Sequence, residues 1–194
     1  MTKTLNRGII NKTGSKNAGD SNDMTKITDI KPIDFNDKEI IKIEINDFAE
    51  KYAYSDVERA LVISPNGNAY NLTGNEKTVY YDIIGKEALK GSISIHNHPV
   101  NLENVKADSF SFDDVYASNK CLEGKQYLIS GTRRDAYEFR EYYPVEEIES
   151  IWDKALKQAW LTHRINGTIV EFEQQDVLRE LGKYLKGFDF YENF

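Results

Sequence analysis

Residues 60–74 read ALVISPNGNAYNLTG and contain two β-like runs joined by turn residues. Leu61 to Ile63 forms the first run, and Ala69 to Leu72 can return beside it as the second. Between them, Pro65 to Asn68 supplies the Pro, Asn and Gly residues that favour tight turns. This arrangement is typical of a β-hairpin, so we expect a sheet in the folded part of the chain.

Other segments follow either the two-residue period of a strand or the spacing of a helix. We expect strands at residues 38–45, 78–84 and 92–95, and a second hairpin formed by residues 126–130 and 135–140. We expect helices at residues 46–58, 111–124, 145–167 and 173–187, and a short helical turn at residues 85–91. Strands with interspersed helices, followed by two C-terminal helices, predict an α+β domain whose helices pack on a mostly antiparallel or mixed sheet.

Composition divides the chain into three parts. Residues 1–34 are rich in Asn, Lys, Thr, Asp and Gly and show no sustained period, so we predict a flexible or partner-docked arm. Residues 35–142 hold the predicted strands and form the central domain, and residues 143–194 form a helical extension. The arm and the helical extension are where we expect a protein partner to bind.

Charge, cysteine content and hydropathy exclude several classes of function. The formal net charge is −7 and no stripe of Lys and Arg interleaved with aromatic residues occurs, which argues against a nucleic-acid partner. The single cysteine, Cys121, can form neither an intrachain disulfide nor a cysteine-rich zinc site. There is no run of about 18 apolar residues and no signal-peptide core, so we expect no membrane span and a cytoplasmic location.

Two of the three histidines, His96 and His98, stand one residue apart at the end of the predicted strand at 92–95. Side chains at i and i+2 of a strand project from the same face, so both imidazoles can point together. Two imidazoles supply two of the three protein ligands that a catalytic zinc needs, and a carboxylate is a common third. Asp114, in the first turn of the following predicted helix, is the expected carboxylate.

A metal site of this kind activates a water and needs a general base to take its proton, most often a Glu. Glu58, just before the apolar run that begins at Ala60, is our candidate, and Glu50 lies one helical stretch earlier. Ser111 can orient a substrate carbonyl or stabilise an oxyanion, and it can also serve as a simple helix N-cap. The alternative for the histidines is a polar strand end with two surface imidazoles.

Taken together, these residues resemble a known signature. Glu58 before a strand, then His96-Asn97-His98-Pro99, then Ser111-Phe112-Asp113-Asp114, is similar to the JAMM motif of the JAB/MPN metallopeptidases. That motif consists of a Glu, a later His-x-His-Pro and then Ser-x-x-Asp. The resemblance covers roughly residues 40–140, and the sequence of the motif is particularly similar to that of bacterial and phage JAB-like domains.

The resemblance implies a fold, an activity and a set of roles. The implied fold is a curved mixed β-sheet flanked by helices. The implied activity is zinc-dependent hydrolysis of an amide or isopeptide bond in a protein or peptide, in the cytoplasm of a bacterial or phage-infected cell. Zinc would be held by His96, His98 and Asp114. Glu58 would be the general acid/base, and Ser111 would lie on the oxyanion side.

One departure from the motif leaves the third ligand open. The segment between His98 and Ser111 is longer than in compact members of the family and contains VNLENVKAD in place of a Gly-rich turn. If these residues are a loop insertion, the ligands stay in place; otherwise the third ligand could be Asp108 or Asp113. We favour Asp114, because Ser-x-x-Asp pairs it with Ser111.

A second function, from a different class, also fits the sequence. The same fold could serve as a non-catalytic binding or assembly module, either associated with a phage head or acting as the docking domain of an effector. The intact set of Glu, His, His, Ser and Asp favours catalysis, whereas the predicted arm and helical extension favour a partner.

Overall fold

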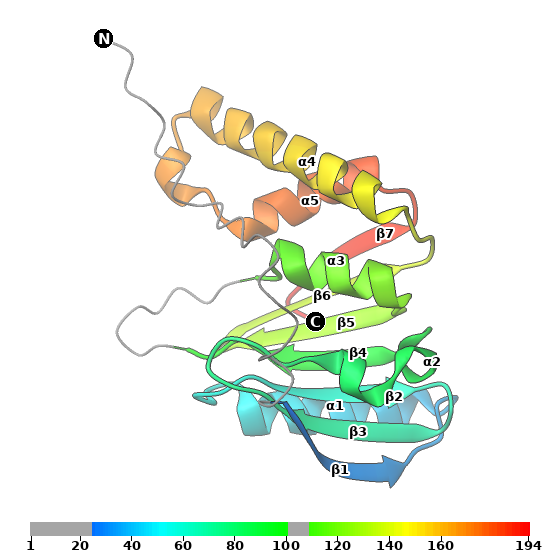
Figure 1. The fold of residues 1–194 in the computed structure, drawn as a ribbon. Helices are drawn as coiled ribbons and strands as arrows, with labels where there is room; N and C mark the ends of the chain where they lie inside the picture. The colour runs from blue at the N-terminus through cyan, green and yellow to red at the C-terminus, as the bar shows by residue number, and fades with distance from the viewer. Residues whose placement is uncertain (1–24, 101–108) are drawn as a thin grey trace.

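The computed structural model describes residues 25–100 and 109–194 of the chain. In this part, seven strands form one open sheet in the order β1-β3-β2-β4-β5-β6-β7 (Figure 1). All neighbouring strands are antiparallel except β4 and β5, which are parallel. The strands are β1 Lys26–Pro32, β2 Arg59–Ser64, β3 Asn68–Thr73, β4 Ile93–Asn97, β5 Lys125–Ser130, β6 Arg133–Phe139 and β7 Phe188–Glu192. The helices are α1 Lys38–Tyr52, α2 Lys86–Leu89, α3 Phe112–Cys121, α4 Val145–Asn166 and α5 Gln174–Tyr184, with 3-10 turns η1 Tyr81–Ile84 and η2 Ile169–Glu171. The fold is therefore α+β with a mixed sheet, as the sequence predicts.

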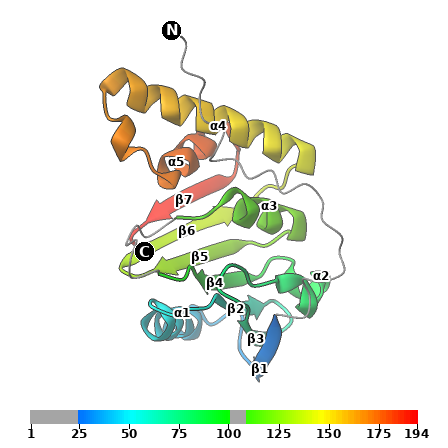
Figure 2. The ribbon, with the colours of Figure 1, turned by 60° about the vertical axis from the view of Figure 1, so that its left-hand side comes forward.

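Helices cover both faces of the sheet (Figures 1 and 2). On one face, α1 packs over the central strands, and its apolar side chains share a core with Leu61, Ile95 and Ile129. On the other face, α3, α4 and α5 lie over β5, β6 and β7, and their shared core includes Tyr137 and Leu178. Each face of the sheet is thus buried by helices from a different part of the chain.

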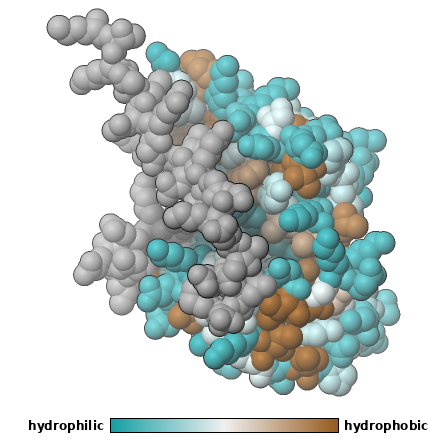
Figure 3. All heavy atoms as spheres, viewed as in Figure 1, coloured by the Kyte–Doolittle hydropathy of each residue, from teal (hydrophilic) through white to brown (hydrophobic). Residues whose placement is uncertain are grey.

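His96 lies between two apolar cores on the second face. Ala60 pairs with His96 and His96 pairs with Leu128, so these three residues lie side by side across β2, β4 and β5. Leu128 belongs to the core under α3, α4 and α5, and Ala60 belongs to a smaller core with Leu89 of α2. In Figure 3, the largest group of apolar side chains on this side lies in the lower half, towards the β1 end of the sheet, and smaller apolar patches lie near α4 and α5. The centre of this sheet face therefore carries a polar group in apolar surroundings.

Residues 38–45 form a helix and not a strand, so that sequence prediction is wrong. The single helix α1 takes in these residues together with the first part of the helix predicted at 46–58. The Asp37 carboxylate caps α1 by accepting hydrogen bonds from two backbone N–H groups of its first turn. The buried residues of α1 follow the spacing of a helix face: Ile41, Ile45, Phe48 and Ala49.

Two further strands, which the sequence analysis does not predict, form the two edges of the sheet. The first, β1, lies within the segment 1–34 predicted as an arm and pairs with β3; residues 1–24 of that segment lie outside the described residues. The second, β7, pairs with β6, so the segment 143–194 contributes a strand to the sheet in addition to its two predicted helices. Residues 78–84, in contrast, form no strand, and η1 occupies their second half.

The remaining elements agree with the sequence predictions. The hairpin of β2 and β3 turns through Gly67, whose φ of +84° is a conformation that glycine adopts without strain. Ser111 caps α3, and Gly167 ends α4 in the left-handed conformation. Among residues 25–100 and 109–194, no helix is both long enough and apolar enough to cross a membrane.

Candidate metal centre

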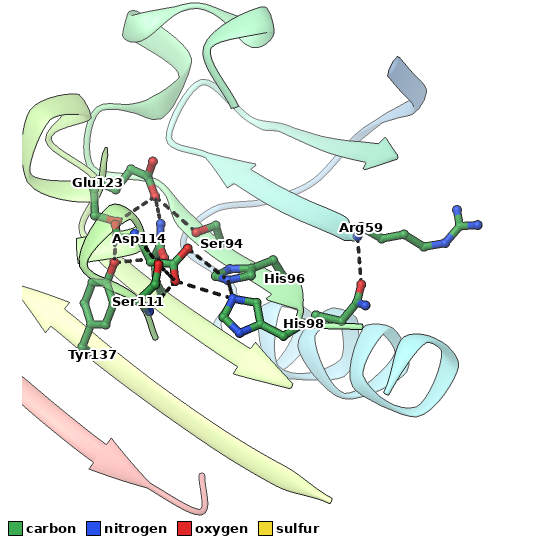
Figure 4. Close-up of polar contacts among 11 residues, drawn as sticks. Arg59, Ser94, His96, His98, Ser111, Asp114, Glu123 and Tyr137 are labelled. Carbon is green, nitrogen blue, oxygen red and sulfur yellow. Dashed lines mark hydrogen bonds and ion pairs between the residues drawn. The ribbon is translucent and has the colours of Figure 1, made fainter. Parts of the chain in front are cut away.

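His96 and His98 lie at the carboxyl end of β4, in the middle of the sheet. His96 is 3% exposed, whereas His98 follows the strand and is partly exposed. Their Nε2 atoms point to the same place and are 3.2 Å apart (Figure 4). The i, i+2 spacing read from the sequence therefore does bring two imidazole nitrogens together.

Asp114 reaches both imidazoles from the first turn of α3. Its Oδ1 lies 3.5 Å from His96 Nε2, and its Oδ2 lies 3.5 Å from His98 Nε2. Ser111 orients this carboxylate, because its backbone N–H and its hydroxyl donate to Asp114 Oδ2 at 2.6 and 2.7 Å. The Asp114 N–H donates in return to Ser111 Oγ at 3.2 Å, which completes a capping box. The interaction that starts α3 thus also fixes the carboxylate.

The donor atoms are of the types that bind metal ions, and they lie close together. Two imidazole nitrogens and one carboxylate oxygen lie within 4.8 Å of one another, a group that could hold a metal ion. A tetrahedral zinc with bonds of roughly 2.0–2.1 Å keeps its ligand atoms about 3.3 Å apart. Here the two Nε2 atoms are 3.2 Å apart, and each lies 3.5 Å from a different oxygen of the Asp114 carboxylate. The side chains of His98 and Asp114 are 18% and 21% exposed, so solvent can reach the group.

The electrostatics favour the ligand form of each residue. Burial lowers the pKa of His96 to about 4, so its imidazole is neutral at pH 7 and Nε2 can offer a lone pair. Burial alone would raise the pKa of Asp114. The neighbouring imidazoles of His96 and His98 and the hydrogen bond from Ser111 outweigh that effect and hold the pKa well below its usual range. Asp114 is therefore an ionised carboxylate at neutral pH.

Glu58 lies at the same site, immediately before β2. Asn97, between the two histidines, bonds to the backbone on both sides of Glu58, which places Glu58 beside the donor group. Burial raises the pKa of Glu58 to about 7; the charge of His98 works against this rise and that of Asp114 adds to it. A carboxyl group with a pKa near neutrality can both accept and release a proton. The structure thus brings together all five residues that the sequence singles out.

The sequence left open other candidates for the third ligand and for the general base. Asp113 neighbours Asp114 but is exposed and does not belong to the donor group. Glu50 is exposed on α1, which covers the opposite face of the sheet. Asp108 lies outside the described residues. Among the described alternatives, the geometry favours Asp114 and Glu58.

A second polar layer beneath the donor group was missed by sequence reasoning. Glu123 is 1% exposed and its Oε2 accepts from Ser94, Ser118 and Gln126. The Tyr137 hydroxyl joins this layer to the metal centre, because it lies 2.8 Å from Ser118 Oγ and donates to the backbone carbonyl of Asp114 at 3.0 Å (Figure 4). One signal in the sequence was available: serines alternate with apolar residues in the strand that leads to the first histidine, Ser92-Ile93-Ser94-Ile95-His96. Polar residues on that face of a central strand need buried partners.

Comparison of the chain with models of protein families, with curated proteins and with solved structures gives no match in any of the three. The function must therefore be argued from the geometry of the site and from the resemblance of its motif.

Proposed function

We propose that this chain is a zinc-dependent hydrolase of the JAB/MPN type, which cleaves an amide or isopeptide bond in a protein or peptide. One observation carries the proposal: His96, His98 and Asp114 bring two imidazole nitrogens and a carboxylate within 4.8 Å of one another, the ligand types of a catalytic zinc. The position of Glu58 beside this group, with a pKa of about 7, adds the proton acceptor that hydrolysis needs.

Each residue has a distinct task in this proposal. Zinc, when bound, would polarise the scissile carbonyl and lower the pKa of a water towards about 7. Glu58 would take the proton of the attacking water and deliver it to the leaving amine. The resemblance implies that Ser111 lies on the oxyanion side, but its hydroxyl donates to Asp114 here, which supports a role in orienting that carboxylate. Stabilising an oxyanion remains a prediction for Ser111 and would require its hydroxyl to turn away from Asp114.

The first test is the zinc content of the purified protein, measured by elemental mass spectrometry. We expect close to one zinc per wild-type chain, and loss of that zinc in His98→Ala and Asp114→Ala. Asp113→Asn is the matched control, because Asp113 neighbours Asp114 and lies outside the donor group. A wild-type chain that takes up no zinc even after reconstitution would contradict the proposal.

The second test separates an enzyme from a binding module that keeps its metal. Glu58→Gln removes the proton acceptor but none of the three donors, so it should retain zinc. It should also lose turnover by at least about 100-fold. Glu50→Gln is the matched control, because it makes the same change on the other face of the sheet. The substrates are internally quenched peptides and peptides joined through a lysine side chain. Equal activity of Glu58→Gln and wild type would refute the catalytic assignment, and zinc without turnover on any substrate would favour the binding module.

A further inference from the structure

We propose that Asn97, the residue between the two histidines, is a positioning residue that holds Glu58 in place. Its side chain is fully buried, at 0% exposure. Its Oδ1 accepts a hydrogen bond from the Arg59 backbone N–H at 2.8 Å. Its Nδ2 donates to the Val57 backbone carbonyl at 3.1 Å. The two bonds end on the residues immediately before and after Glu58.

The sheet explains why a side chain is needed at this point. The last paired residues of β2 and β4 are Ala60 and His96, and no further backbone pairing joins the two strands beyond them. The backbone N–H of His98 instead donates to Ile129 of β5 at 3.0 Å, so the chain that follows β4 is bound to the opposite neighbour. The hydrogen bonds of the Asn97 side chain therefore join the two chains where the backbone ladder between β2 and β4 ends.

The other contacts of Glu58 are with backbone groups, and one of these, at Val79, forms a hydrogen bond with the Glu58 carboxyl group. The Glu58 N–H donates to the Asn75 carbonyl at 2.7 Å, and the Gly74 N–H donates to the Glu58 carbonyl at 2.8 Å. These bonds join the segment to the chain after β3, which carries no donor of the metal group. The bonds of Asn97 are those that join it to β4, the strand that leads to both histidines.

Only a few side chains can do what Asn97 does. The position requires one acceptor and one donor on a short, neutral, buried group, which an amide provides. An Asp would keep the acceptor for Arg59 but lose the donor for Val57. An Ala would lose both and leave two partly buried backbone groups without this partner. The inference is thus specific to the amide and not to polarity in general.

The inference rests on the proposed function, because the task of Glu58 is defined there. The donors on β4 are held separately by the ladder to β5, so a change at Asn97 should leave the metal ligands in place. It should move the Glu58 carboxyl relative to them. A misplacement of about 1 Å can cost about 100-fold in rate. We therefore expect Asn97→Ala to lower kcat by about 10- to 100-fold, with little change in KM.

The experiment uses the full chain and three measurements: zinc per chain, the kcat and KM of the substrate that the wild type cleaves, and the exchange rate of the Arg59 amide by NMR. The matched control is Asn119→Ala. Asn119 is also buried, at 2% exposure, and it brackets the backbone of Tyr143 through two hydrogen bonds of 2.8 Å. If Asn97→Ala does not fold, Asn97→Ser serves as the second variant, because it keeps a small, neutral, polar side chain at this buried position.

The outcomes separate this inference from the proposed function. We expect Asn97→Ala to keep its zinc, to lose kcat and to exchange the Arg59 amide faster, whereas Asn119→Ala keeps wild-type kcat and slow Arg59 exchange. Wild-type kcat in the Asn97 variants would overturn the inference, as would unchanged exchange at Arg59. Loss of zinc together with turnover would also overturn it, because Asn97 would then support the ligands. A wild-type chain without zinc or turnover would refute the proposed function. The exchange rate of the Arg59 amide would still decide whether Asn97 holds residues 57–59 in place.

Discussion

Replacing Glu123 by Gln should remove a cost in stability that the wild type carries at high pH. The carboxyl group of Glu123 is buried beneath the metal centre, where Oε2 accepts from Ser94, Ser118 and Gln126. Its Oε1 is buried too and has no hydrogen-bond partner among the described residues. A charged carboxylate is therefore only half satisfied here, whereas the carbonyl oxygen of a Gln could accept the same three bonds without carrying a charge.

The magnitude follows from the shift in pKa. Burial raises the pKa of Glu123 from 4.5 to about 7, although hydrogen bonds from its three partners lower it again in part. A carboxyl group whose pKa is higher in the folded than in the unfolded state costs no stability below about pH 4.5, where both states are protonated. The cost grows as the pH rises and is complete above about pH 7. Above about pH 7 the cost amounts to about 3 kcal/mol.

The assay is urea unfolding of the zinc-free wild type and of Glu123→Gln at pH 5 and pH 8. The side chain of the variant cannot ionise. The free energy of unfolding of the variant minus that of wild type should therefore be larger at pH 8 than at pH 5, by about 2 to 3 kcal/mol. Glu58 and His96 also have shifted pKa values, but they are present in both proteins and cancel in this comparison. Glu149→Gln, an exposed change on α4, is the control and should show no such dependence. A difference between Glu123→Gln and wild type that is the same at both pH values would refute the reasoning.

Two further substitutions test the site and the core. Ser111→Ala removes the capping box of α3, so it should lower the free energy of unfolding, measured in urea, by about 1 kcal/mol. Because Asp114 also loses its orienting partner, zinc binding in a competition titration should weaken by about tenfold or more. Undiminished zinc affinity would show that Asp114 needs no such support. Leu178→Ala creates a cavity at a fully buried position of α5 and should lower the free energy of unfolding by about 2–5 kcal/mol. Ile165→Ala, at a position that is 82% exposed, should stay within about 0.5 kcal/mol of wild type. A similar loss in both variants would mean that α5 is not packed as described.

The error at α1 shows where periodicity alone is ambiguous. In the segment KEIIKIEI, isoleucines fall at 40, 41, 43 and 45, so a strand can place three of them on one face and a helix can bury two of them a turn apart. The buried pair is Ile41 and Ile45, and the same stripe continues to Phe48 and Ala49 in the following segment. The helical spacing appears only when both segments are read as one element.

The two edge strands escaped prediction for different reasons. β1 buries almost none of its side chains and is held to β3 by backbone hydrogen bonds, so its sequence KITDIKP shows no apolar face. β7 does carry a signal, because Phe188 and Phe190 alternate with polar residues, but the segment is short and follows two strong helical patterns. A strand at the edge of a sheet needs fewer buried side chains than a central one, and its sequence is correspondingly less informative.

The donor residues could be predicted because their spacing is local. His96 and His98 lie two apart on one strand, and Ser111 and Asp114 lie three apart at the start of one helix, so each pair carries its own geometry. The residues that support them could not be predicted in the same way. Glu123 bonds to a serine 29 positions earlier, and Asn97 to residues 38 and 40 positions earlier. Only the register of the sheet brings such partners together.

This division also explains how the site tolerates a long connection between its two halves. The histidines are fixed by β4, which is paired on both sides in the centre of the sheet. Asp114 is fixed by its own capping box on α3, and α3 is anchored to the sheet by the hydrogen bond from the Tyr137 hydroxyl to the Asp114 carbonyl. The separations of 3.2 to 3.5 Å are therefore set by two elements that pack on the same sheet face, and not by the length of the segment that joins them.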